Sequence, residues 1–152
     1  MKIKVMSRID MNSIMLKALY NHTPIEAGII SISSSGFGKL PSLVFAKEVG
    51  LVPNVIFEEF DDIDMQVAYY YPITVPVAVD MVNFAKDLDE VWIHCDAGIS
   101  RSAGVACALD EYYNLDGRSS FYWTDGYHHP NGLVYRTVMN VLNSGYIPFS
   151  DY

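Results

Sequence analysis

The stretch from His94 to Ser102 reads His-Cys-Asp-Ala-Gly-Ile-Ser-Arg-Ser, and it decides the fold and the chemistry expected of this chain. Its first two residues, His94 and Cys95, end a short apolar run over residues 91–95. This run has the composition of a buried strand. After it, apolar residues recur at helical spacing as far as Tyr113. We therefore predict a strand, a tight loop and a helix that begins near Arg101.

A loop of this kind is suited to bind an anion. The backbone N–H groups of residues 96–100 can converge on one point, and the positive end of the following helix is directed at the same point. Gly98 permits a positive φ if the curl requires it. Arg101 adds a planar, permanently charged fork for two phosphate oxygens. The predicted substrate-binding residues are Asp96, Ala97, Gly98, Ile99, Ser100 and Arg101.

The cysteine in this stretch is the predicted nucleophile. Helix N-termini and nearby cations lower cysteine pKa values from about 8.5 to roughly 3.5–7.5, which favours the reactive thiolate. We expect Cys95 to attack, Ser102 to donate its hydroxyl to the sulfur when the sulfur leaves, and His94 to orient the cysteine. A buried structural thiol is the alternative for Cys95 and the expected role of Cys107. About 9 Å of helix separates Cys107 from the loop, too far for a disulfide with Cys95.

Strands and helices alternate along the rest of the chain. Further strands are predicted at residues 2–6, 29–33 and 55–60, and helices after Asp10 as N-cap, after Pro41, from Thr74 and from Asn131 to Gly145. This order predicts one α/β domain over residues 1–152. Its central sheet is expected to be mostly parallel, with about four to five strands and helices on both faces. The order of the strands is left open.

Composition and charge narrow the class of protein. Apolar residues make up 51% of the 152 residues and charged residues 18%, a composition that folds. The net charge of −8 provides no global attraction for nucleic acid or an anionic membrane, so neither is an expected partner. The sequence contains no apolar run of roughly 18 residues and no secretory signal pattern, so a cytoplasmic location is expected.

The stretch resembles the signature of cysteine-dependent protein phosphatases, His-Cys-x-x-Gly-x-x-Arg-Ser, at every specified position. Residues 97–100 and the pair Pro130-Asn131 resemble the dual-specificity branch in particular. The arrangement extends over roughly residues 50–145, although only the cysteine loop is highly specific. The resemblance implies a phosphocysteine intermediate, no metal or other cofactor, and phosphorylated Tyr, Ser or Thr in proteins as substrate.

The general acid is expected from another loop at the same edge of the sheet, because parallel strands place their ligands there. The strand at 55–60 ends in Asp61-Asp62-Ile63-Asp64, and dual-specificity relatives carry their catalytic aspartate at a similar distance before the cysteine. We choose Asp62; Asp64 is favoured by spacing alone, and Asp61 is third. Further along the chain come Tyr69, Tyr70 and Tyr71. Their side chains are expected either to pack in the ordinary way or to form an aromatic wall near the anion-binding pocket.

Several departures from related branches leave alternatives open. The chain is shorter than tyrosine-specific members, has Gln66 as its single glutamine, and lacks a Trp-Pro-Asp loop. Its loop carries acidic Asp96 where lipid-directed relatives often have lysines. A phosphoinositide phosphatase, an RNA 5′-phosphatase and a catalytically weak phosphate-binding module remain alternatives. The net negative charge of the chain weakly disfavours the phosphoinositide phosphatase and the RNA 5′-phosphatase, because their substrates are strongly anionic.

Overall fold

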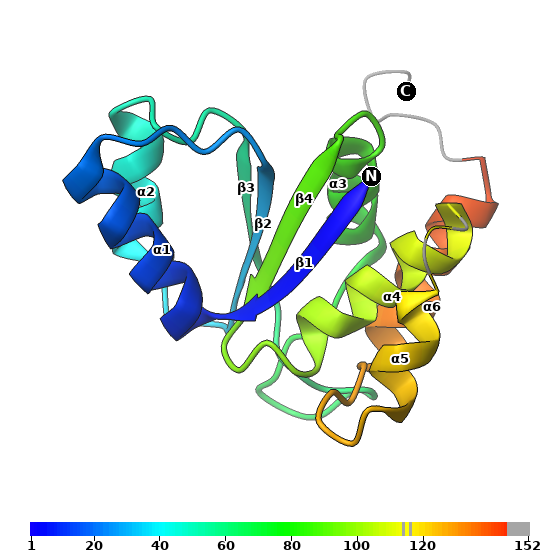
Figure 1. The fold of residues 1–152 in the computed structure, drawn as a ribbon. Coiled ribbons are helices and arrows are strands. Elements are labelled where there is room, and N and C mark those ends of the chain that lie inside the picture. Colours follow the sequence, from blue (N-terminus) through cyan, green and yellow to red (C-terminus); the bar gives the residue numbers. More distant parts are fainter. Residues whose placement is uncertain (114, 116, 146–152) are drawn as a thin grey trace.

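A computed structural model describes residues 1–113, 115 and 117–145 of the chain (Figure 1). The strands are β1 (Lys2–Ser7), β2 (Gly28–Ser33), β3 (Val55–Glu59) and β4 (Glu90–Cys95). The helices are α1 (Arg8–Asn21), α2 (Pro41–Glu48), α3 (Val75–Ala85), α4 (Arg101–Tyr113), α5 (Arg118–Thr124) and α6 (Gly132–Asn143).

The four strands form one parallel sheet in the order β1-β4-β2-β3. Helices α1 and α2 cover one face, and α3, α4 and α6 lie on the other (Figure 1). The predicted fold class is therefore confirmed: a single α/β domain with helices on both faces. The sheet has four strands and is parallel throughout. Strand β4, which carries Cys95 at its end, lies between β1 and β2.

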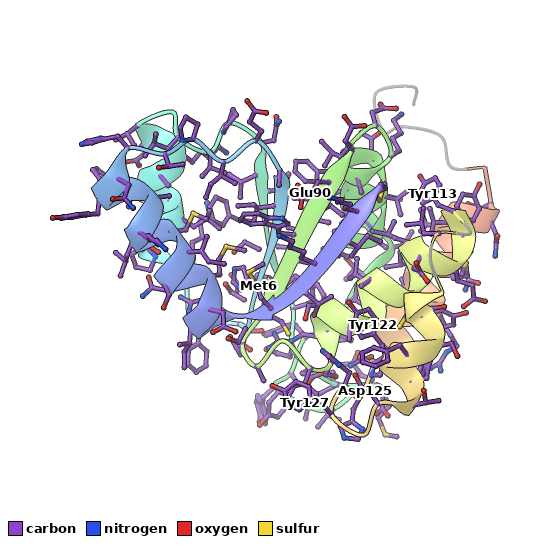
Figure 2. The ribbon with its side chains drawn as sticks, viewed as in Figure 1. Met6, Glu90, Tyr113, Tyr122, Asp125 and Tyr127 are labelled. Atoms are coloured by element: carbon purple, nitrogen blue, oxygen red, sulfur yellow. The ribbon has the colours of Figure 1, made fainter. Side chains whose placement is uncertain are left out.

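Two apolar layers hold the helices to the sheet. In β2, Ile29 packs with α1 and α2, whereas Ile30 and Ile32 pack with α3, α4 and α6. All six residues of β2 are buried, as expected for a central parallel strand covered on both faces. Side chains fill the space on both sides of the sheet, and Tyr122 of α5 is buried within the second layer (Figure 2).

Two local expectations were wrong. The first helix begins at Arg8 with Ser7 as its N-cap, and the Ser7 hydroxyl accepts a hydrogen bond from the Asp10 N–H at 3.1 Å. Asp10 instead lies in the first turn of α1, where its negative charge interacts favourably with the positive end of the helix dipole. Helix α5 was not predicted, because Phe121 and Trp123 on it are exposed and form no inward-facing stripe. The helix expected from Thr74 is present with Thr74 as its N-cap, and Asn131 is the N-cap of α6, as expected.

Among the described residues, no helix combines the length and apolar character needed to cross a membrane.

Candidate active site

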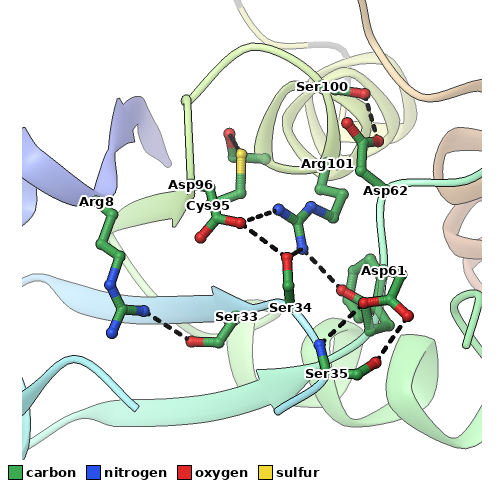
Figure 3. A network of polar contacts seen from close by, with 12 residues as sticks. Arg8, Ser33, Ser34, Ser35, Asp61, Asp62, Cys95, Asp96, Ser100 and Arg101 are labelled. Atoms are coloured by element: carbon green, nitrogen blue, oxygen red, sulfur yellow. Dashed lines mark hydrogen bonds and ion pairs between the residues drawn. The ribbon is translucent and has the colours of Figure 1, made fainter. Parts of the chain in front are cut away.

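The loop of residues 96–100 joins the end of β4 to the start of α4 and forms the floor of a cavity of about 730 Å³ (Figure 3). Residues that follow β2 and β3 line the same cavity, together with His129. The carboxyl ends of neighbouring parallel strands meet at one edge of the sheet, which is where open α/β sheets place their ligands. Of the predicted loop residues, all but Gly98 line this cavity, and Asp62 lines it as well.

Close contact with β1 fixes the curvature of this loop. Gly98 has φ +72°, and a Cβ at this position would lie 2.5 Å from the carbonyl carbon of Met6 and 2.6 Å from the nitrogen of Ser7. The Arg8 N–H also donates to the carbonyl oxygen of Asp96 at 3.0 Å. Since backbone atoms cannot move aside as a flexible side chain can, glycine is required here for both its conformation and its size.

The two cysteines have different environments. Cys95 is buried at the cavity, with its Sγ 3.1 Å from the hydroxyl oxygen of Ser102, which is also buried. Cys107 lies inside the apolar layer, where burial, followed by the charges of Asp110 and Glu111, raises the pKa of its thiol to about 12. Both thiols are free. Ionisation of Cys107 is therefore suppressed at neutral pH, and the thiol beside the loop is the one available for chemistry.

Arg101 is 3% exposed, and segments from three parts of the chain hold its guanidinium. Its Nη1 donates to the Ser34 hydroxyl at 3.0 Å and to the Phe60 carbonyl at 2.8 Å, and its Nη2 donates to Asp96 Oδ2 at 2.9 Å (Figure 3). A guanidinium has five N–H groups. The Nε–H is buried and has no partner among the described residues, and one Nη2 hydrogen is also left over.

His94 lies beneath the cysteine and is fully buried. Its Nδ1 is 3.3 Å from the carbonyl oxygen of Cys95, which can only accept, so Nδ1 carries the proton. Its Nε2 then accepts from the Ser31 hydroxyl at 2.6 Å. Burial lowers the pKa of His94 to about 4, although the bond to the Cys95 carbonyl opposes this shift. The imidazole is therefore neutral and orients the end of β4.

Asp61 is a buried anchor of its loop. It accepts hydrogen bonds from the Ser35 N–H (2.9 Å), the Ser35 hydroxyl (2.7 Å) and the Tyr71 N–H (2.7 Å). Burial by itself would raise the pKa of Asp61, but these hydrogen bonds and the charge of Arg101 hold it below its usual value. A carboxylate held in this form is poorly suited to donate a proton.

The neighbouring Asp62 faces the cavity and contacts the loop directly. Its Oδ1 accepts from the Ser100 hydroxyl at 2.7 Å and from Asn131 Nδ2 at 2.9 Å. Asp62 and Asp64 are both exposed, but Asp62 lines the cavity and Asp64 does not. Of the three candidate acids, Asp62 is the one joined to the cysteine loop.

Exposed aromatic side chains form the opposite wall of the cavity. Tyr69 is 95% exposed, Tyr70 52% and Phe37 76%, and all three line the cavity. Of the two interpretations of the three tyrosines, the geometry supports an aromatic wall. Tyr71 is also exposed and contributes its backbone N–H to Asp61.

Sequence reasoning missed two residues of the site. Ser34 follows β2 and bonds Arg101, and the polar run of residues 33–35 after a strand was the available signal. Asn131 was identified as the start of the last helix and as part of the resemblance, but not as a site residue; its side chain donates to Asp62 and to the carbonyl oxygen of Ile63 at 3.1 Å. No group of three His, Cys, Asp or Glu side chains suited to a metal ion occurs within residues 1–113, 115 and 117–145.

Comparisons with known proteins show a distant likeness in fold. No protein-family model matches the chain, and no curated protein matches its sequence. Among solved structures, it is similar to the human tyrosine phosphatase-like serine/threonine/tyrosine-interacting protein. The identity is 17% and the TM-score 0.46, over 86% of this chain and 83% of the other. At this distance the likeness assigns no activity, and the chemistry is inferred from the site.

We expect Gly98→Ala to destabilise the protein strongly, because the added methyl group meets the backbone of Met6 and Ser7. Gly36→Ala is the matched control: its φ is +80°, but nothing lies within 4 Å of the added Cβ. Urea unfolding should show a loss of about 1–3 kcal/mol for Gly98→Ala beyond that of the control. Equal losses would mean that the loop does not rest on β1 as described.

We expect the buried neutral His94 to make stability depend on pH. Its pKa of about 4 lies below the ordinary value of 6.5, so the unfolded chain binds the proton more readily. The stabilisation is complete above about pH 6.5 and is lost as the pH falls toward 4. Between pH 7 and pH 5, the free energy of unfolding should fall by about 2 kcal/mol more than in His94→Gln. Parallel pH profiles for the two proteins would contradict a buried neutral imidazole.

Proposed function

We propose that this protein is a phosphomonoester hydrolase that acts through a phosphocysteine intermediate, as a dual-specificity-like protein phosphatase. The observation that carries the proposal is the state of Arg101 beside Cys95. Arg101 is 3% exposed, three of its five N–H groups are occupied, and its Nε–H has no partner among the described residues. Nε–H and the remaining Nη2 hydrogen lie on one edge of the guanidinium, the geometry that binds two oxygens of a phosphate.

In the first proposed step, the Cys95 thiolate attacks phosphorus. An S–P bond forms, the ester P–O bond breaks, and Asp62 gives a proton to the leaving oxygen. The loop N–H groups and Arg101 hold the charge on the equatorial oxygens, an electrostatic contribution that is large in a partly dehydrated site.

In the second step, water replaces the cysteine. Asp62, now a carboxylate, accepts a proton from the water that attacks phosphorus, and the P–S bond breaks. The Ser102 hydroxyl, 3.1 Å from Sγ, stabilises the thiolate that leaves. Inorganic phosphate is released, and Asp62 is again protonated for the next cycle.

The cavity favours a substrate with a single phosphate on a side chain. Asp61, Asp62 and Asp96 line it with Arg101, so its described lining carries more negative than positive charge. An inositol polyphosphate or a 5′-triphosphate RNA end would place additional negative charge against these carboxylates. The aromatic wall of Phe37, Tyr69 and Tyr70 offers apolar contact to a side chain or to a flanking peptide. We therefore propose phosphorylated Tyr, Ser or Thr in proteins as the substrate.

We expect Cys95→Ser to abolish hydrolysis of a small aryl phosphate while phosphate binding remains, because the loop and Arg101 are unchanged. Arg101→Lys should lose most of the activity, since a point charge does not reproduce the planar contact with two oxygens. Cys107→Ser is the control and should keep full activity. The measurements are initial rates and binding of inorganic phosphate by calorimetry. Phosphate binding without turnover in the unmodified protein would identify a binding module, and residual activity above a few per cent in Cys95→Ser would exclude Cys95 as nucleophile.

We expect Asp62→Asn to lower kcat by roughly 10²–10⁴-fold, the usual contribution of a general acid. The loss should be smaller for aryl phosphates whose leaving group needs no proton, and the alkaline limb of the pH–rate profile should flatten. Asp64→Asn should retain its rate because that side chain does not line the cavity. If Asp64→Asn lost the rate and Asp62→Asn kept it, the acid would be Asp64. Asp61→Asn tests the hydrogen bonds by which Asp61 holds its loop, and it should mainly lower the free energy of unfolding.

A further inference from the structure

We infer that Asp96 and Ser34 form a clamp that positions Arg101 by binding the edge of the guanidinium opposite to the one offered to phosphate. The inference rests on the proposed function, because it explains how the anion-binding edge is oriented. Asp96 is itself a member of the loop, whereas Ser34 follows β2 on the neighbouring strand. The acidic side chain inside an anion-binding loop thereby gains a positioning role.

The contacts form a closed ring. Arg101 Nη1 donates to the Ser34 hydroxyl at 3.0 Å, and that hydroxyl donates to Asp96 Oδ2 at 2.8 Å. Arg101 Nη2 donates to the same Asp96 oxygen at 2.9 Å (Figure 3). Because one serine oxygen bridges Nη1 and the carboxylate that Nη2 binds, both acceptors lie at the end of the guanidinium between its two Nη atoms.

The remaining donors face another way. The second Nη1 hydrogen is directed to the Phe60 carbonyl at 2.8 Å, on the side of the arginine stem. This leaves Nε–H and one Nη2 hydrogen, which are adjacent in the covalent structure of the group. The clamp occupies two of the five donors and the Phe60 carbonyl a third, which leaves free the pair that matches two phosphate oxygens.

A clamp is needed because arginine is flexible and its charge is almost completely buried here. Fixing a long side chain at the moment of binding costs about 0.5–1.5 kcal/mol, and an arginine already held in place avoids that cost. Asp96 is suited to hold it. Burial would raise the pKa of Asp96, but the hydrogen bonds from Ser34 and Arg101, together with the charges of Arg101 and Arg8, lower it.

The negative charge of Asp96 also repels phosphate. The test must therefore separate the effect of this charge from the effect of Asp96 on the position of the Arg101 guanidinium. Asp96→Asn and Asp96→Ala both remove the charge, but only asparagine keeps an oxygen that can accept from Arg101 and Ser34. Comparing these two variants therefore isolates the clamp. We expect inorganic phosphate to bind Asp96→Asn about 3- to 10-fold more tightly than Asp96→Ala. Ser34→Ala, which keeps the charge, should bind phosphate more weakly than the unmodified protein. Equal affinities of the two Asp96 variants would overturn the inference.

A second measurement does not depend on phosphate. The chain contains four arginines, so the ¹H–¹⁵N signals of their Nε–H groups are few, and the Arg101 signal is assigned by its loss in Arg101→Lys. It should be sharp in the unmodified protein and in Asp96→Asn, and broadened in Asp96→Ala and Ser34→Ala. An Arg101 signal unchanged in all variants would show that Asp96 and Ser34 do not hold the side chain.

The two measurements distinguish failure of the clamp from failure of the proposed function. A signal that responds to the variants, in a protein that neither binds phosphate nor hydrolyses an aryl phosphate, would support the clamp and contradict the phosphatase proposal. Hydrolysis with equal phosphate affinity in Asp96→Asn and Asp96→Ala would support the phosphatase and contradict the clamp. Urea unfolding of each variant verifies that the measurements are made on folded protein.

Discussion

The site depends on one constraint: the positive charge of Arg101 is removed from water and must be satisfied by the protein. A buried charge without partners is very unfavourable, so its acceptors have to be supplied at fixed positions. They come from Ser34 after β2, the Phe60 carbonyl after β3, and Asp96 after β4. These segments meet because the strands are parallel and β2 lies between β3 and β4 in the sheet.

The loop that carries this arginine is held from two further directions. On one side, Gly98 lies against the junction of β1 and α1, at a distance that excludes any side chain. On the other side, the Asn131 N–H donates to the Ser100 carbonyl at 3.0 Å, and the Asn131 side chain both caps α6 and binds Asp62. The packing of α6 on α4 consequently determines where Asp62 lies relative to the cysteine. Core packing and the geometry of the candidate site are therefore linked through a single asparagine.

Charge in the cavity limits what it can bind. The described lining carries three aspartates against the single positive charge of Arg101, so local donors must provide the attraction for an anion. Local hydrogen bonds within a partly buried site are strong enough for this, whereas long-range attraction is weak in salt solution. The substrate that we propose, a phosphate group on an otherwise uncharged side chain, meets these conditions, and the aromatic wall offers contact area to its remainder.

Local sequence patterns were sufficient to predict the described strands and helices except α5, and to single out the loop between Cys95 and Arg101, because these features depend on local chemistry. Apolar periodicity, the caps Thr74 and Asn131, and the spacing from Cys95 to Arg101 all act within a few residues. Local signals did not settle the first helix cap, since Ser7 and Asp10 are both good capping residues. Tertiary structure alone distinguished buried Asp61 from Asp62, and it alone joined Ser34 to Arg101 and Asn131 to Asp62. These contacts span 67 and 69 residues of chain, and they form only because the strand order and the packing of α6 bring those segments to one edge of the sheet.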